Sequence, residues 1–173
     1  MFAMRPATAA DIPAVEAMIL TRCAWMEERG LLSWRRNAGD LAGQAVNPDG
    51  DMWVLANTTG RIIGCTTVQE KTFHCGWTDE ERAEPAHYLY SSVTDPAYRR
   101  YRPGTAMALW AVDRAAAEGR TWVRRGCNYP ALVDYYASQG FTLIHDVQRT
   151  NHRYYLMARR AEPIADLSER FPA

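Results

Sequence analysis

This sequence has almost no lysine, no long apolar run and no net charge. Its 173 residues include no apolar stretch near the roughly 18 that cross a bilayer, and residues 1–6 carry no signal-peptide core. We therefore expect a cytoplasmic protein with no membrane partner. Lys71 is the single lysine among 20 basic residues, so arginine, whose planar guanidinium binds flat anions, carries almost all of the positive charge.

Several common functional motifs are absent as well. The 20 basic residues balance 20 acidic ones, and zero net charge supplies no field that would gather nucleic acid, so we expect no nucleic-acid partner. The glycine-rich loops of nucleotide hydrolases and dinucleotide enzymes are missing, as is the nucleophile elbow of serine hydrolases. The four cysteines have no regular spacing, which indicates free thiols. His74, Cys75 and His87 match no zinc pattern, so we expect no metal.

The composition itself is that of a globular domain. Hydrophobic residues make up 47% and charged residues 23% of the chain. A chain of this length buries roughly 70% of its unfolded surface and needs no disulfide or metal to fold. We expect one domain over residues 1–173, with a peripheral tail at 161–173. Helical and strand patterns alternate along the chain, which indicates an α/β or α+β fold.

The spacing of apolar residues predicts the individual elements. Strands are expected at residues 4–7, 52–56, 62–70, 87–94, 121–125, 141–145 and 153–158. Helices are expected at residues 8–29, 37–45, 105–118 and 130–140. Thr8 and Asp11 predict a capping box at the start of the first helix, and Gly30 supplies its stop. Residues 47–50 predict a turn, and the polar, acidic residues 71–86 predict a long loop.

The most informative segment lies where the strand at 87–94 passes into the helix at 105–118. Such a junction suits an anion, because the first amides of a helix are unpaired and the helix dipole places about half a positive charge there. Arg99, Arg100 and Arg102 add positive charge at the same place. By itself, a stretch like this favours a solvated basic turn that binds nothing.

The order of the elements and two motifs resemble the GCN5-related N-acetyltransferase family. The family's pyrophosphate loop, Pro-x-x-Arg/Gln-x-x-Gly-x-Gly/Ala, is similar to the stretch from Pro96 through Arg99 to Gly104. The family's later segment, Asn-x-x-Ala-x-x-x-Tyr-x-x-x-Gly-Phe, resembles residues 129–141. The resemblance covers about residues 4–160. Each motif alone is weak, but their order and spacing together are fairly specific.

Three positions depart from the family's pattern. Arg102 stands where the family usually has the first glycine of its loop, and glycine there lets the backbone approach the phosphates closely. Pro103 follows it and has no N–H to donate. Tyr129 takes the usual asparagine position, with Asn128 just before it.

The resemblance implies a fold and a co-substrate. The fold would be a single α/β domain with a mixed, mostly antiparallel sheet that splays at the cofactor site and is flanked by helices. The co-substrate would be acetyl-CoA, with no metal. Its pantetheine arm would pair with the strand that ends at Val93 and Thr94. The other implied cofactor-binding residues are Arg99, Arg100, Tyr101, Arg102, Gly104, Thr105 and Tyr129.

The resemblance also implies a catalytic acid. Tyr136 lies four residues before Gly140, as the family's tyrosine does, and a phenol with a pKa near ~10 suits a leaving thiol with a pKa of about 8.5. Tyr135 is its neighbour, and helical periodicity alone does not choose between the two. The general base stays open among Glu70, His87 and a chain of water. No residue near Cys127 in the sequence would activate it, so we expect direct transfer in a ternary complex.

The acceptor follows only in outline. The resemblance implies acetyl transfer to a primary amine, most simply on a small molecule, and Trp25, Trp34 and Trp53 with Arg35 and Arg36 fall where the family shapes its acceptor pocket. Two alternatives stay open: a CoA-binding or regulatory module without catalysis, and an acetyltransferase acting on a protein or aminoacyl-tRNA amine. Edge strands make a homodimer plausible.

Overall fold

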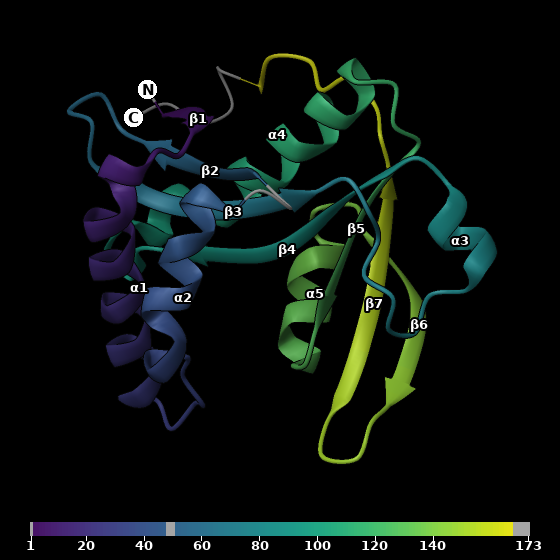
Figure 1. The fold of residues 1–173 in the computed structure, drawn as a ribbon, viewed down its shortest axis with the longest axis horizontal. Coiled ribbons are helices and arrows are strands. Elements are labelled where there is room, and N and C mark those ends of the chain that lie inside the picture. The colour runs from purple at the N-terminus through teal and green to yellow at the C-terminus, as the bar shows by residue number, and fades with distance from the viewer. Residues whose placement is uncertain (1, 48–50, 168–173) are drawn as a thin grey trace. The chain divides into compact units, whose positions relative to one another are not determined.

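The computed structural model describes residues 2–47 and 51–167. Its strands form one sheet in the order β1 (Ala3–Pro6), β2 (Asp51–Ala56), β3 (Ile62–Gln69), β4 (Ala86–Thr94), β5 (Trp122–Cys127), β7 (Arg153–Arg160) and β6 (Thr142–Gln148) (Figure 1). β4 and β5 pair in parallel, whereas β1–β2, β2–β3, β5–β7 and β6–β7 pair antiparallel. The predicted α/β fold with a mixed, mostly antiparallel sheet is confirmed.

Five α-helices accompany these strands in the described part of the chain. They are α1 (Ile12–Glu27), α2 (Ala38–Gly43), α3 (Asp79–Ala83), α4 (Pro103–Ala117) and α5 (Pro130–Ala137). Most of the predicted elements are found within a few residues of their expected bounds. The turn expected at 47–50 lies outside the described residues apart from Asn47, and so does the end of the tail after residue 167.

The chain divides into two compact units. One comprises Met1–Val68, Ser91–Met107 and Asp166–Ala173, and the other comprises Gln69–Tyr90 and Ala108–Ala165. β4 and α4 therefore each contribute residues to both units.

In the first unit, α1 and α2 lie side by side, as Figure 1 shows. Buried residues of both helices form one apolar cluster with residues of β2 and β3, among them Val15, Ile19, Ala42, Val54 and Cys65. Burial of this amphipathic face, more than intrinsic helix propensity, stabilises helices of this length.

Asp11 fixes the entry into α1. Its carboxylate accepts hydrogen bonds from the Arg5 guanidinium at 2.7 and 2.8 Å and from the Thr8 N–H at 2.8 Å. The carboxylate half of the predicted capping box is therefore present. The Arg5 hydrogen bonds hold the pKa of Asp11 well below its usual range. At the other end of the helix, Gly30 has φ +68°, the left-handed conformation expected of a glycine stop.

In the second unit, α5 runs beside β5, and β6 and β7 form an antiparallel hairpin (Figure 1). Trp77, Tyr88, Leu156 and Ala158 form a buried cluster, with Trp122 and Val147 packed against it. Gly140 follows α5 with φ +83°. The tail is tied to this unit, because the Ile164 N–H donates to the Asp113 carboxylate of α4 at 2.9 Å.

The prediction of a continuous loop over residues 71–86 is wrong, because α3 lies within it. Thr78 caps this helix: the Glu81 N–H donates to the Thr78 hydroxyl at 3.2 Å, and the Thr78 N–H donates to the Glu81 carboxylate at 2.8 Å. This reciprocal pair is a capping box, which satisfies two amides that the helix leaves free. A helix of five residues buries no apolar stripe, so no helical periodicity marks it in the sequence.

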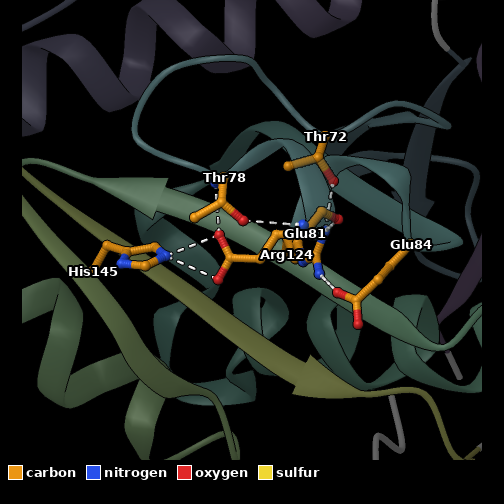
Figure 2. Close-up of polar contacts among 6 residues, drawn as sticks. All are labelled: Thr72, Thr78, Glu81, Glu84, Arg124 and His145. Carbon is orange, nitrogen blue, oxygen red and sulfur yellow. Dashed lines mark hydrogen bonds and ion pairs between the residues drawn. The ribbon is translucent and has the colours of Figure 1, made fainter.

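Side-chain contacts from β5 and β6 attach α3 to the sheet, as Figure 2 shows. His145 Nε2 lies 2.9 Å from both oxygens of the Glu81 carboxylate. The buried Arg124 guanidinium donates to the Thr72 hydroxyl at 3.2 Å, to the Glu81 carbonyl and to the Glu84 carboxylate. Burial opposes ionisation of Glu81, but hydrogen bonds from Thr78 and His145 hold the pKa of this carboxyl below its ordinary value.

We predict that Glu81→Gln lowers the free energy of unfolding by about 1 kcal/mol at pH 7. A carboxyl whose pKa is lowered by folding stabilises the fold above its unfolded pKa, near 4.5, and loses that contribution as pH falls through the folded value. The deficit of the variant should therefore shrink below about pH 4. Chemical denaturation of the parent and the variant at several pH values between 3 and 7 would measure this difference in the free energy of unfolding.

Glu80→Gln is the matched control, because Glu80 is exposed and lies in the same first turn of α3. It removes the same charge from the same end of the helix dipole and leaves the contacts of Glu81 intact. Equal losses in the two variants would contradict a specific role for the Glu81–His145 pair.

Candidate active site

The exit of β4 is fixed by Asp95. Its buried carboxylate accepts from the Arg61 guanidinium at 2.9 Å and from the Ala97 N–H at 2.9 Å, and its own N–H donates to the Ile63 carbonyl at 2.9 Å. The carboxylate thus caps the 3₁₀ segment Pro96–Tyr101 and is neutralised by Arg61. The Asp95 carboxylate therefore does not neutralise the arginines that follow it in the sequence.

Arg102 joins the 3₁₀ segment to α4 in a left-handed conformation, with φ +53° and ψ +49°. Glycine adopts this conformation freely, whereas a residue with a Cβ is strained there by about 1–2 kcal/mol. Three hydrogen bonds hold it: its N–H donates to the Arg99 carbonyl at 3.0 Å, and its carbonyl accepts from Thr105 and Ala106 at 2.9 and 3.1 Å. Pro103 takes the first helical position, where a missing N–H costs nothing.

Three exposed arginines surround the start of α4. Arg100 lies over the Tyr101 ring, 4.6 Å from its centroid, and donates to the Tyr101 hydroxyl. Within the described residues, no carboxylate forms an ion pair with Arg99, Arg100 or Arg102. The first turn of a 15-residue helix and three cations without counter-ions make this place suitable for a polyanionic ligand.

Close packing holds this helix start against the sheet. A Cβ at Gly64 of β3 would lie 2.9 Å from the Met107 sulfur of α4 and 3.5 Å from the Val93 carbonyl. Gly64 leaves room for the Met107 side chain, whose flexible end would have to shift for any larger residue at this position. Val93 is buried and Thr94 is half-buried, so the end of β4 is set firmly within the first unit.

The structure distributes the predicted site residues over the two units. Those in the first unit lie on one continuous stretch at the end of β4 and the start of α4: Val93, Thr94, Arg99, Arg100, Tyr101, Arg102, Gly104 and Thr105. Tyr129 and Tyr136 lie in the second unit. Tyr129 directly precedes α5, and its carbonyl accepts from the Leu132 N–H at 2.9 Å.

Of the two neighbouring tyrosines on α5, Tyr136 is buried and Tyr135 is exposed, at 9% and 36% accessibility. The ring of Tyr136 faces β5, where the Arg125 guanidinium lies 3.5 Å from its centroid. The Phe141 ring packs on the same side, 6.4 Å from Tyr136. The helical phase that the sequence left open is therefore set with Tyr136 toward the sheet.

The two candidate bases both have partners in the second unit. Glu70 is exposed and lies 3.1 Å from the Arg120 guanidinium. His87 is buried, with its Nε2 2.9 Å from the Glu118 carboxylate. Burial lowers the pKa of His87, against the opposing effect of Glu118. A contact that the sequence did not reveal thus joins His87 of β4 to Glu118, the residue that follows α4.

The aromatic and basic residues expected near the acceptor lie in the first unit. Trp25 is covered by two guanidinium groups, Arg22 at 4.5 Å and Arg29 at 4.1 Å from its ring centroid. Trp34 is exposed, and Arg35 pairs with Glu27 at 2.7 Å. Trp53 is half-buried and Arg36 is exposed.

Sequence reasoning missed Arg125. The pattern Trp-Val-Arg-Arg at 122–125 indicates a strand but says nothing of which arginine finds a counter-ion. Two consecutive charged residues inside an otherwise apolar strand were the available signal, because a strand buries at least one of its two faces.

Taken together, a mixed α/β sheet and an arginine-rich helix start define a protein suited to an anionic ligand. Residues 16–141 match the family model described as the acetyltransferase (GNAT) family, and the chain belongs to this family. The resemblance found in the sequence motifs is thereby confirmed. No curated protein matches the sequence.

Solved structures with low sequence identity share the fold. A GNAT-family acetyltransferase from Listeria monocytogenes is 15% identical, with 92% of this chain and 94% of that chain covered and a TM-score of 0.68. The ribosomal-protein-S18-alanine N-acetyltransferase from Escherichia coli is 16% identical, with coverages of 96% and 97% and a TM-score of 0.64. The spermidine N-acetyltransferase from Vibrio cholerae is 12% identical, with coverages of 92% and 94% and a TM-score of 0.66.

Two features are absent from the described residues. None of the helices within residues 2–47 and 51–167 is both long enough and apolar enough to span a membrane. Nor do three or more His, Cys, Asp or Glu side chains in the described part of the chain gather into a group that could hold a metal ion.

The left-handed backbone at Arg102 yields a prediction about stability. Arg102→Gly should be more stable than Arg102→Ala by about 1 kcal/mol, because only glycine adopts this conformation without steric cost. Ala17, exposed in the middle of α1, is the control: there Ala17→Gly should lose about 1 kcal/mol relative to alanine. Urea denaturation gives both differences. The same sign at both positions would contradict the left-handed assignment.

Proposed function

We propose that the protein transfers an acetyl group from acetyl-CoA to a primary amine of a small-molecule acceptor, directly and within a ternary complex. The observation that carries the proposal is the start of α4, where a chain of the GNAT family places three exposed arginines without counter-ions among the described residues. We further propose that residues 1–173 act as one acyltransferase domain in the cytoplasm.

The residues at the end of β4 and the start of α4 fit a pyrophosphate. Arg99, Arg100 and Arg102 supply charge, and the first turn of α4 supplies the positive end of the helix dipole. Val93 and Thr94 would offer main-chain groups to the pantetheine arm, in the manner of an added strand. Tyr101 would supply aromatic surface, and Gly104 and Thr105 would complete the turn. Tyr129, in the second unit, stays a predicted cofactor contact.

The end of the β4–β5 ladder supports a place for an extended ligand. Parallel pairing of β4 with β5 runs from Ala86 with Trp122 to Leu89 with Arg125, and both strands continue beyond it. Tyr90, the next residue on β4, is 48% exposed. Main-chain groups that leave a ladder are free to pair with a ligand.

Bound acetyl-CoA would supply an acetyl group activated as a thioester. The neutral amine of the acceptor attacks the carbonyl carbon, so that a C–N bond forms as the C–S bond breaks. Tyr136 donates its hydroxyl proton to the leaving thiolate, and the proton released by the amine restores the phenol through solvent. Burial raises the pKa of Cys127, so this residue stays a thiol, which supports direct transfer over an acyl-enzyme.

The acceptor has to be argued from this chain's own residues. One protein of this fold is named for a ribosomal-protein alanine and another for spermidine, so the fold does not determine the acceptor. A net charge of zero favours a small molecule over an aminoacyl-tRNA. The homodimer expected from edge strands stays a prediction.

The first experiment is a thermal-shift titration with acetyl-CoA. At 100 times its Kd, acetyl-CoA should stabilise the fold by about 2.7 kcal/mol, which corresponds to roughly 5–10 °C for a chain of this size. Arg99→Gln combined with Arg102→Gln should reduce the shift, whereas Arg149→Gln, at an exposed turn between β6 and β7, should not. ATP and NAD serve as ligand controls. The absence of any shift at millimolar acetyl-CoA would reject the cofactor assignment.

The second experiment tests the acid. Tyr136→Phe should lower kcat by about 10²-fold or more, because the leaving thiolate loses its proton donor, and should leave the Kd for acetyl-CoA nearly unchanged. Tyr135→Phe removes the exposed neighbouring hydroxyl and should retain activity. If Tyr136→Phe binds acetyl-CoA and turns over like the parent, Tyr136 is not the acid. If neither form acetylates any amine, the non-catalytic module becomes the better explanation.

A further inference from the structure

Arg125 carries a buried charge that no group among the described residues neutralises. Its side chain projects from β5 onto α5, with only 5% of the residue exposed, and its guanidinium lies 3.5 Å from the centroid of the Tyr136 ring and 5.6 Å from that of Phe141. Its Nε atom is buried without a partner, as is that of Arg124, so the two arginines differ in the partners of their terminal nitrogens. Among residues 2–47 and 51–167, no carboxylate or carbonyl forms an ion pair or hydrogen bond with the Arg125 guanidinium.

The adjacent Arg124 shows what this unit does with an arginine that it buries for structural reasons. Arg124 points to the opposite face of β5, and its guanidinium binds the Glu84 carboxylate, the Thr72 hydroxyl and the Glu81 carbonyl (Figure 2). A buried guanidinium with this set of partners is compensated. Arg125 is equally buried and has only aromatic faces, which compensate a charge in part.

The titratable groups that interact with Arg125 are neutral and supply no hidden counter-ion. Burial raises the pKa of Tyr88 to about 12, although Arg125 acts to lower it. Burial likewise raises the pKa of Cys127 against the effect of Arg125. Near pH 7 one is a phenol and the other a thiol, so the positive charge of Arg125 stands alone.

The position of Arg125 connects it with the reaction. It is the last residue of β5 in the parallel pairing with β4, where its partner is Leu89, and the next residue of β4, Tyr90, is exposed. The ring on which the guanidinium stacks belongs to the proposed acid, Tyr136. An anion bound to Arg125 would therefore lie beside the Tyr136 ring.

We propose that Arg125 binds a carboxylate carried by the acceptor, so that the substrate class is amines with a neighbouring carboxylate, as in amino acids. The inference rests on the proposed acetyl transfer. A planar guanidinium matches a carboxylate through two parallel N–H···O bonds, and pairing in a dry site resolves the uncompensated charge. Arginines at the start of α4 are already available to the phosphates of the cofactor. We therefore assign Arg125 to the acceptor and not to the cofactor.

The test compares amino acids with the corresponding amino-acid amides, which differ at the carboxylate. The parent protein should acetylate the acids in preference to the amides. Arg125→Gln should lower kcat/KM for the acids by about 100-fold and change that for the amides by less than about threefold. Arg125→Lys keeps the charge without the planar fork and should lose about tenfold. Arg160→Gln is the control, because Arg160 also stacks on a ring, that of Trp122, but is exposed.

A binding measurement separates recognition from turnover. Calorimetric titration of the same amino acids into protein saturated with CoA should detect binding to the parent and to Arg160→Gln, and a loss of at least about tenfold in affinity for Arg125→Gln. If Arg125→Gln does not fold, the acid-to-amide ratio of the parent and the Arg125→Lys variant still test the proposal.

Each other outcome overturns it. Equal rates with acids and amides in the parent, or equal losses for both in Arg125→Gln, would mean that no carboxylate is bound. Weaker acetyl-CoA binding by Arg125→Gln, with the acceptor preference unchanged, would assign the charge to the cofactor. These results all assume a parent that responds to acetyl-CoA in the thermal-shift titration. A parent that neither responds nor acetylates any amine shows instead that the proposed acetyl transfer itself is wrong.

Discussion

The permanent charge of arginine is the constraint on which much of this structure depends. A guanidinium keeps its proton at any physiological pH, so an arginine that folding buries needs a counter-ion, a carbonyl or an aromatic face. A buried lysine can lose its proton and become neutral, because burial lowers its pKa. Since this chain has a single lysine, almost all of its basic side chains are arginines, which stay charged when they are buried. The consequence is that its packing is organised by guanidinium contacts: Arg124 holds α3 to the sheet, and Arg5 holds Asp11 at the entry to α1.

The same constraint distinguishes structural arginines from those available to a ligand. At the end of β4, the carboxylate of Asp95 is taken by Arg61 and by the cap of the 3₁₀ segment, so it does not neutralise Arg99 or Arg102. A protein with equal numbers of acids and bases can leave a local positive site only by placing its acids elsewhere. The left-handed conformation at Arg102 has a parallel meaning. Strain of this kind persists where hydrogen bonds on both sides over-determine the backbone, as they do here.

The sequence was informative where periodicity and stop signals carry the structure, and uninformative where tertiary contacts do. The strands and the longer helices were predictable because burial of one face makes apolar residues recur every 2 residues in a strand and every 3.6 residues in a helix. α3 was not, although Thr78 and Glu81 spell a capping box, because five residues bury no stripe and the helix depends on Arg124 and His145 from distant strands. The spacing of Thr78 and Glu81 is the one local signal of this helix, within an otherwise acidic and polar segment.

The candidate site divides in the same way. Motif spacing indicated the start of α4, because an anion site at a helix N-terminus is a local structure of consecutive residues. It could not choose between Tyr135 and Tyr136, since the phase of a short helix is fixed only by what lies beneath it, here Arg125 and Phe141. It could not single out Arg125 either, because the absence of a counter-ion is a property of the folded surroundings and not of neighbouring residues in the sequence.

Buried charge also bears on which acceptors this fold can serve. Proteins that share the fold at 12–16% identity are named for acceptors as different as spermidine and a ribosomal-protein alanine, so the backbone does not distinguish them. We expect the fixed positive charge stacked on the proposed acid to distinguish these acceptors. A polycationic amine would be repelled by the Arg125 guanidinium, because charges interact strongly in a buried, weakly screened site. A zwitterionic amine instead brings a carboxylate, which serves as the counter-ion of Arg125. The acceptor specificity of such an enzyme would therefore depend on whether β5 presents an unpaired charge, here Arg125, beside Tyr136. One substitution at this position could reverse that specificity while the fold stays the same.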